Sequence, residues 1–178
     1  LVLAGLAAAT FVAGRSSDET GGRLELLLST PLTRARWAIA SGIGVALAVG
    51  VSVALLAVSI AAGVAVAGGE VVTPAIGTAA LFVYGSAMAG VGLAVAGLTR
   101  ASLAAPAVLV VAIATFLMDL LAQALRLPDW VRQLALSSHM GEPMVGSWDV
   151  AGLVACAVLA IGGLVIGAWG MTRRDVSA

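Results

Sequence analysis

The sequence predicts an all-α, multipass transmembrane helical bundle. Of its 178 residues, 61% are hydrophobic and only 10% are charged, and the mean hydropathy is +1.12. Soluble globular domains carry about 25% charged residues. The hydrophobic residues also gather in long runs, and about 20 apolar residues suffice for a helix to cross a bilayer. These observations exclude a soluble domain, and the formal net charge of zero argues against nucleic acid as a partner.

The first apolar run, Leu1–Gly14, is 14 residues long, too short to cross a bilayer as a helix. A signal peptide would carry a basic region before its apolar part, and this run has none. We therefore expect residues 1–14 to be the end of a truncated transmembrane helix. Residues 15–36 are expected to form a loop, in which Ser16 and Ser17 before two acidic residues favour the start of a new helix.

The remainder, residues 37–178, is predicted to hold four transmembrane helices. A helix satisfies all its backbone polar groups internally, as lipid requires. A polar stretch at about 126–148 separates the third of these helices from the fourth. The four predicted spans are Trp37–Ala67, Ala75–Leu98, Leu103–Leu125 and Val150–Gly170.

The arginines predict the orientation of the spans. If the spans alternate, seven of the nine arginines fall on one side of the membrane, in residues 15–36, 99–102 and 171–178. The other side has only Arg126 and Arg132. Because cytoplasmic loops carry an excess of basic residues, the 15–36 loop and the C-terminus are expected in the cytoplasm.

The tryptophans predict the same arrangement. Trp37 and Trp169 fall at the expected cytoplasmic boundary, whereas Trp130 and Trp148 fall at the outer one. Tryptophan is enriched at both membrane–water interfaces, where its ring lies at the level of the headgroups. The two signals are independent and indicate one topology.

Small residues recur at intervals of four in three of the spans. They are Gly42, Ala46, Gly50 and Ala54 in the first, Ser86, Gly90 and Ala94 in the second, and Gly163 and Gly167 in the last. Such faces let transmembrane helices approach closely, which predicts a tight bundle or a dimer interface. The alternative is that a chain rich in alanine and glycine produces these spacings by chance.

The 15–36 loop contains the segment "GRLELLLSTPLTR", residues 22–34. Leu24, Leu27 and Leu28 fall on one helical face, while Arg23 and Glu25 lie away from it. The helix cannot continue through Pro31, and Thr33 can cap a new helix that enters the membrane. From the residues alone, the segment is a short amphipathic helix at the membrane interface.

This segment resembles the cytoplasmic loop of type-2 ABC exporter permeases, and is most similar to the actinobacterial branch that exports polyketide antibiotics and other drugs. The family pattern is G-x-L-E-x-L-L-x-[ST]-P-x-[ST]-R. The order of spans also matches the later spans of the family, so the resemblance implies the C-terminal part of a six-span permease half in the bacterial cytoplasmic membrane.

In that family the loop forms a coupling helix that docks on an ATP-binding subunit. The resemblance implies that Arg23 and Glu25 make polar contacts with that subunit, that Leu24, Leu27 and Leu28 pack the helix, and that Pro31 and Arg34 fix the bend into the membrane. It implies no cofactor in this chain, because ATP and Mg²⁺ would bind to the partner. A second permease half or a homodimer partner completes the assembly. The expected cargo is a hydrophobic or amphipathic compound, such as an antibiotic.

The outer stretch 126–148 is too polar to span, and its residues predict a short interfacial helix followed by a loop at Gly141–Pro143. The resemblance implies a re-entrant pair of short helices here. Just before this stretch, Asp119 is an acid inside an apolar run, where acids are costly and commonly functional. Gln123 and Arg126 share its helical face. We expect either a polar cluster near the outer interface or a place on the translocation path.

Two other classes of function stay open from the sequence. In an ion- or proton-coupled carrier, Asp119 would be the coupling acid. In an intramembrane enzyme, Ser138 or His139 would be needed, although no orienting third group accompanies them; a passive assembly subunit is the remaining alternative. The chain has no P-loop, so any ATP hydrolysis must come from another chain. Cys156, the single cysteine, is expected to be a small buried core residue.

Overall fold

The computed structural model describes residues 1–20, 33–125 and 140–173, without the side chains of residues 16, 18–20, 34 and 123. The chain is predominantly helical, as predicted. Its elements are α1 (Val2–Thr20), α3 (Arg34–Val66), α4 (Val72–Gly77), α5 (Ala79–Leu98), α6 (Ala101–Ala124), β1 (Gly141–Glu142), the 3-10 turn η2 (Pro143–Val145), β2 (Ser147–Trp148) and α8 (Val150–Arg173).

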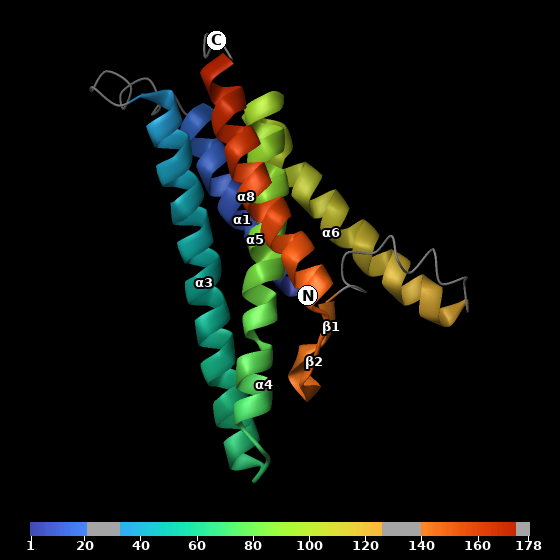
Figure 1. The fold of residues 1–178 in the computed structure, drawn as a ribbon. Coiled ribbons are helices and arrows are strands. Elements are labelled where there is room, and N and C mark those ends of the chain that lie inside the picture. The colour runs from blue at the N-terminus through green and yellow to red at the C-terminus, as the bar shows by residue number, and fades with distance from the viewer. Residues whose placement is uncertain (21–32, 126–139, 174–178) are drawn as a thin grey trace.

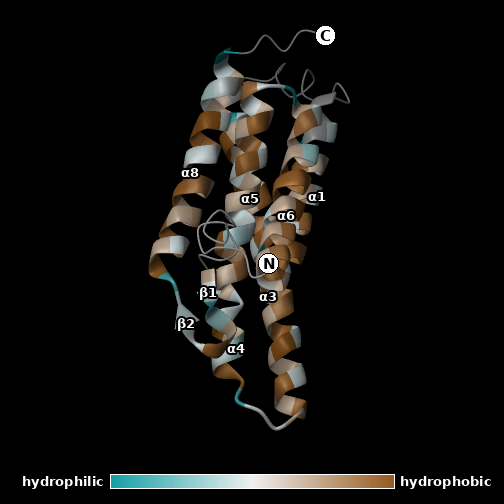
Figure 2. Ribbon diagram, turned by 90° about the vertical axis from the view of Figure 1, so that its right-hand side faces the viewer, coloured by the Kyte–Doolittle hydropathy of each residue, from teal (hydrophilic) through white to brown (hydrophobic). Residues whose placement is uncertain are grey.

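Within the described residues, four helical segments are long and apolar enough to cross a membrane: Ala35–Val66, Val72–Leu98, Ala101–Ala122 and Val150–Arg173. They correspond to the four predicted spans and alternate in direction, as predicted (Figure 1). We call the end of the bundle where α1 ends, α3 begins and α8 ends the loop end. The opposite end, with residues 67–71 and 140–149, is the hairpin end. Figure 2 shows hydrophobic residues along the helices and hydrophilic ones near these ends.

Helix α1 differs from the prediction. It continues through Arg15 and the following serines to Thr20, so the expected helix start at Ser16 and Ser17 is wrong. Serine and acidic residues only mildly disfavour a helix interior, and tertiary contacts override such preferences. Here Arg15 is buried against α3, and this contact holds the last turns of α1 in place.

Helix α5 is the centre of the bundle and contacts α1, α3, α6 and α8. Its tightest contact is with α8, where the glycines of the two helices face each other. A methyl group on Gly90 would lie 2.6 Å from the carbonyl oxygen of Leu159, and one on Gly167 would lie 2.5 Å from that of Leu93. The close approach predicted from Gly90, Gly163 and Gly167 is therefore confirmed.

Not all of the small residues predicted to form one face of α3 contact other helices. Gly42 contacts Leu164 of α8, and Gly50 lies beside the Phe82 ring of α5. Ala54, at the end of the same predicted face, is exposed. The face therefore packs within the bundle from Gly42 to Gly50 but not at Ala54.

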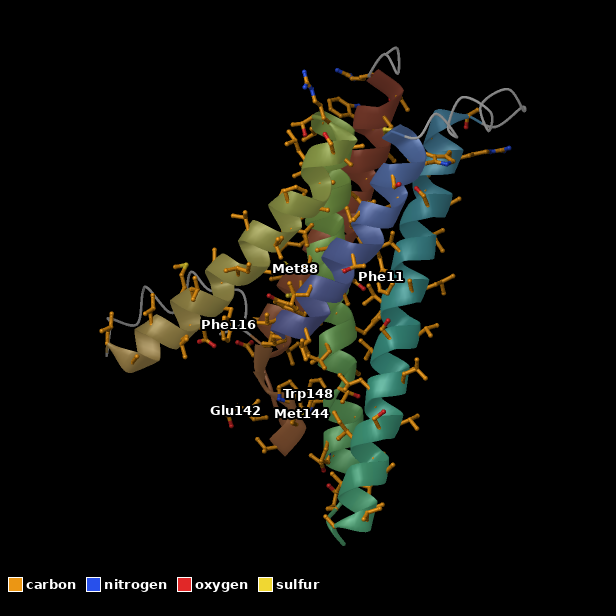
Figure 3. All side chains as sticks on the ribbon, turned by 180° about the vertical axis from the view of Figure 1, so that it is seen from behind. Phe11, Met88, Phe116, Glu142, Met144 and Trp148 are labelled. Atoms are coloured by element: carbon orange, nitrogen blue, oxygen red, sulfur yellow. The ribbon has the colours of Figure 1, made fainter. Side chains whose placement is uncertain are left out.

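The core lies where α1, α5 and α6 meet and includes Val12, Tyr84, Met88 and Val108, all at most 1% exposed. Cys156 belongs to it, as predicted, with its Sγ 3.6 Å from Sδ of Met140. Figure 3 shows Met88 in this interior.

The described part of the outer stretch, residues 140–148, forms a small β-hairpin where the sequence predicted a loop. Gly141 pairs with Trp148 and Glu142 with Ser147. The turn packs on α4, where a methyl group on Gly77 would lie 2.5 Å from the Pro143 carbonyl oxygen. The expected short helices do not extend into these residues, and for residues 126–139, outside the described part, they stay a prediction.

Candidate functional site

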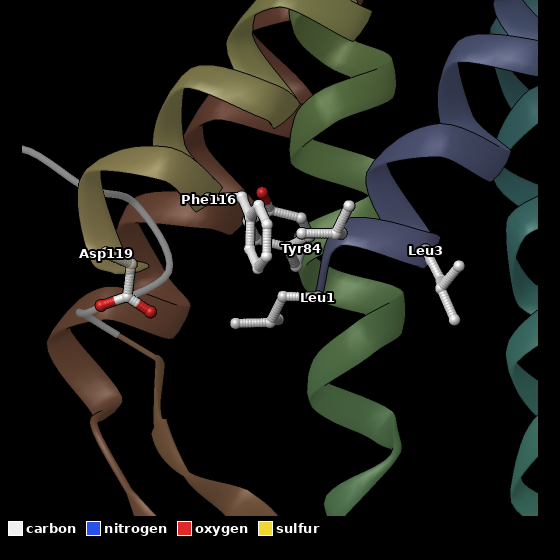
Figure 4. Close-up of a pocket in the computed structure, with 6 residues that line it drawn as sticks. Leu1, Leu3, Tyr84, Phe116 and Asp119 are labelled. Carbon is white, nitrogen blue, oxygen red and sulfur yellow. The ribbon is translucent and has the colours of Figure 1, made fainter. Parts of the chain in front are cut away.

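A cavity of about 360 Å³ lies between α1, α5 and α6 in the half of the bundle nearer the hairpin end (Figure 4). Helix α6 diverges from the other helices toward that end, which leaves room beside α1 and α5 (Figure 1). The residues that line the cavity are Leu1, Val2, Leu3, Tyr84, Phe116 and Asp119. An acid thus stands in a surface that is otherwise made of aliphatic and aromatic side chains.

A hydrogen-bonded pair joins α5 to α6 next to this cavity. Tyr84, which is 1% exposed, has its hydroxyl oxygen 3.4 Å from Oγ1 of Thr115. Thr115 also donates to the carbonyl oxygens of its own helix, at 2.9 Å to Val111 and 3.1 Å to Ala112. Asp119 lies one turn beyond Thr115 on α6, so the two polar side chains share the face that looks toward α1 and α5.

Of the predicted group Asp119, Gln123 and Arg126, the structure places only the side chain of Asp119. The Gln123 side chain and Arg126 lie outside the described residues. No hydrogen bond or ion pair joins Asp119 to another described side chain, and its neighbours come from three helices. Sequence reasoning missed Tyr84, because its place beside α6 depends on how the helices pack, and it also missed Phe116, although the spacing of three residues before Asp119 on one helix could have suggested it.

A second cavity of about 290 Å³ lies on the other side of α1, toward α3. Leu1 and Leu3 line both cavities. Its remaining lining is apolar apart from Ser52, whose hydroxyl donates to the carbonyl oxygen of Ala48 at 2.9 Å.

At the loop end, Arg15 joins α1 to α3. Its Nε donates a 2.8 Å hydrogen bond to Oγ of Ser41, and its guanidinium carbon lies 4.9 Å from the centre of the Trp37 ring. Ser41 in turn donates to the carbonyl oxygen of Ala38 at 3.0 Å. We call Arg15, Trp37 and Ser41 the Arg15 clamp. The sequence analysis used Arg15 only as one of the basic residues that predict the orientation of the spans. An arginine and a tryptophan at the two ends of one loop could have suggested the contact.

The residues predicted to dock a partner lie outside the described part of the chain. These are Arg23, Leu24, Glu25, Leu27, Leu28 and Pro31; Arg34 begins α3, but its side chain is not described. The predicted helix cap beside them is confirmed, since Oγ1 of Thr33 accepts a hydrogen bond of 3.3 Å from the backbone N–H of Arg36.

Comparison with known protein families matches residues 1–172 to the family described as multidrug efflux system permease Rv1217c, C-terminal domain. The match covers every described element up to the last turn of α8. A search among curated proteins finds no match.

Proposed function

Because the chain belongs to the family of the C-terminal domain of the multidrug efflux system permease Rv1217c, we propose that it is the membrane-spanning part of an ATP-driven exporter. The cargo in this proposal is a hydrophobic or amphipathic compound, such as an antibiotic. The match over residues 1–172 is the observation that carries the proposal, and it agrees with the resemblance of residues 22–34 to the loop of type-2 ABC exporter permeases.

In this proposal, residues 23–28 form a coupling helix. Arg23 and Glu25 contact an ATP-binding subunit, the leucines at 24, 27 and 28 pack the helix, and Pro31 and Arg34 set the bend into α3. ATP and Mg²⁺ bind to that subunit and not to this chain. A second permease half or a second copy of the chain completes the translocation path.

The Arg15 clamp supports this role. The segment 21–32 leaves α1 and enters α3 at the loop end, and the clamp ties these two helices together beside it. A displacement of the segment would therefore move α1 and α3 as a pair. Both helices contact α5, so the displacement would reach the centre of the bundle and the wall of the Asp119 cavity.

The orientation follows from the same proposal. The loop end faces the cytoplasm of a bacterium, where ATP is available, and the C-terminus lies on that side of the inner membrane. Described arginines gather there: Arg15, Arg36, Arg100 and Arg173 all lie at or near the loop end (Figure 1). This distribution agrees with the excess of basic residues in cytoplasmic loops.

The test is purification of the full-length protein from its native membrane with an ATPase assay, with and without vanadate. We expect an ATP-binding subunit to co-purify and its activity to be vanadate-sensitive. The double variant Arg23→Glu/Glu25→Arg exchanges the two charges. It should lower ATP-dependent transport about tenfold or more, because each reversed charge would repel the group of the partner that it is proposed to contact.

Glu142→Arg is the matched control, because Glu142 is an exposed acid at the hairpin end, away from the loop (Figure 3). It should leave transport unchanged. Transport that follows a proton gradient without any ATP-binding partner would contradict the proposal and favour a carrier that uses Asp119.

A further inference from the structure

We propose that a cavity between α3, α5 and α8 binds a ring-sized, uncharged group that forms a hydrogen bond with Ser86. The ligand it predicts is a compound dissolved in the membrane that carries a phenol-like group, one ring with one hydroxyl. The inference rests on the proposed export function and adds to it a class of cargo.

The size of the cavity suits a single ring. Its volume is about 160 Å³, and its lining comes from three helices. An apolar cavity of roughly 150 Å³ can accommodate benzene. The space exists because most of the lining residues have side chains no larger than a methyl group: Gly42, Ala46, Ala89, Gly90 and Ala160.

The cavity opens sideways, between α3 and α8. Near the loop end these two helices touch, because Gly42 lies against the side chain of Leu164. Toward the hairpin end they separate (Figure 1, Figure 2). Ile161, which lines the cavity from α8, is 65% exposed. A compound dissolved in lipid can therefore reach the cavity from the side without crossing water.

The cavity lies in the half of the bundle nearer the loop end. Gly42 is five residues from Trp37, and Leu164 is five residues from Trp169. At 1.5 Å per residue, each lies roughly 8 Å along its helix from the tryptophan, whose type is enriched at the membrane interface. In the proposed orientation this is the cytoplasmic half of the bilayer, from which an exporter would collect a compound that has entered the cell.

Among the described residues that line the cavity, Ser86 alone has a polar side chain. Its hydroxyl oxygen is buried and has no hydrogen-bond partner within the described part of the chain. Other serines inside the spans are satisfied by their own helix: Ser52 donates to the carbonyl oxygen of Ala48 at 2.9 Å, and Ser59 to that of Leu55 at 2.8 Å. A buried hydroxyl without a partner is costly, so a ligand that supplies the partner is favoured.

The surroundings of Ser86 favour an organic hydroxyl over water or a charged group. A buried water typically makes about three hydrogen bonds, whereas the described lining offers one polar side chain. A charge would be buried without a counter-charge, which is costly. A phenol-like group brings apolar surface for the lining and needs one partner only, and a serine hydroxyl can either donate to it or accept from it.

The experiment uses the full-length protein in lipid nanodiscs without ATP and measures equilibrium binding by fluorine NMR. The probe with a hydroxyl is 4-fluorophenol, and fluorobenzene is the matched probe without one. Empty nanodiscs give the partition of each probe into lipid. We expect Ser86→Ala to weaken binding of 4-fluorophenol about three- to tenfold, the effect of losing one hydrogen bond. Binding of fluorobenzene should stay within about twofold, because it makes no hydrogen bond with Ser86.

Ser59→Ala is the matched control for this variant. It removes the hydroxyl of an exposed serine in a span, away from the cavity, and it should change neither probe. No effect of Ser86→Ala on 4-fluorophenol would overturn the inference, as would an equal loss of both probes. Binding of both probes no greater than to empty nanodiscs would also overturn it, and would indicate that a lipid chain fills the cavity.

Ala46→Leu tests the location of the site, because a larger side chain on α3 would fill the cavity. It should abolish protein-dependent binding of both probes. Ala54→Leu is the matched control, the same substitution at an exposed position of the same helix, and it should leave both probes bound. Unchanged binding in Ala46→Leu would refute the location. If that variant does not fold, Ala160→Leu on α8 decides by the same criteria.

The outcome is separable from that of the proposed function. Equilibrium binding needs no nucleotide, so a protein that binds 4-fluorophenol through Ser86 but has no ATP-binding partner would refute ATP-driven export and leave this site intact. Vanadate-sensitive transport, with binding of 4-fluorophenol that does not depend on Ser86, would do the reverse.

Discussion

Nε of Arg15, near the end of α1, donates a 2.8 Å hydrogen bond to Oγ of Ser41 on α3, across the segment that connects the two helices. The arginine side chain is only 8% exposed and stacks on Trp37. Arginine suits this position because its planar guanidinium can donate a hydrogen bond and cover an aromatic face at the same time. The pair therefore fixes the distance between the two ends of the loop that we propose to receive force from a partner.

Arg15→Ala should destabilise the protein by about 1.5–3 kcal/mol, the range for a hydrogen bond to a charged group, and should leave the Trp37 ring uncovered. Thermal unfolding followed by tryptophan fluorescence measures the change. Arg15→Lys should recover little, since lysine lacks the planar group.

Arg36→Ala is the control for this prediction, because Arg36 is an exposed arginine of the first turn of α3. It should leave the unfolding temperature nearly unchanged. If Arg15→Ala and Arg36→Ala changed the unfolding temperature equally, the contacts of Arg15 with Ser41 and Trp37 would contribute no more to stability than the charge of an exposed arginine.

The four spans and their alternation could be predicted because lipid leaves the chain little choice. An apolar run of sufficient length must be helical to satisfy its backbone, whatever it packs against. The Thr33 cap was equally local, since it requires only a hydroxyl one residue before the helix. The buried position of Cys156 followed from its apolar neighbours.

The residues of α1 and α5 that line the cavity with Asp119 could not be predicted, because they depend on the divergence of α6 from these two helices. Hydropathy indicates that α6 spans a membrane but not its tilt, which is set by packing against other helices. The continuation of α1 past Ser16 was also missed. The local sequence favours a helix start at Ser16 and Ser17, whereas in the structure Arg15 contacts Ser41 of α3 and α1 continues to Thr20.

The seam between α5 and α8 predicts opposite outcomes for two adjacent glycines. A methyl group on Gly163 would collide with the backbone of Gly90, whereas one on Gly162 would meet no atom within 4 Å outside its chain neighbours and the nearby backbone of its own helix. Gly163→Ala should therefore push the helices apart and cost about 1–3 kcal/mol, as overpacking does. Gly162→Ala should be neutral or stabilise by about 0.5–1 kcal/mol, because alanine loses less backbone freedom in a helix.

Unfolding of the two variants in the same detergent, with the wild-type protein alongside, provides the measurement. The two variants carry the same substitution at adjacent positions of α8 and differ in whether the added methyl group faces α5. Similar stabilities for Gly163→Ala and Gly162→Ala would contradict the close packing of α5 against α8, because then neither glycine would be required for the approach.

Glu70 predicts how the hairpin end responds to pH. Its carboxylate accepts hydrogen bonds from the backbone N–H groups of Thr73, at 3.0 and 3.1 Å, and Val72, at 2.7 Å, which begin α4. The Thr73 backbone bond is the largest cause that lowers the pKa of Glu70 below its ordinary value, and the bond from Val72 acts in the same direction. The charged carboxylate thus stabilises the first turn of α4.

Because the folded-state pKa is lowered, this stabilisation is fully present above the ordinary glutamate pKa of about 4.3. It is lost as the pH falls through the lower folded-state value. Glu70→Gln should therefore lower the unfolding temperature at pH 6–7, and the gap to the wild-type protein should narrow below about pH 4. Glu142→Gln, a change of another exposed acid at the same end, serves as the control. A gap for Glu70→Gln that is constant from pH 7 to pH 3 would show that its carboxylate does not cap α4.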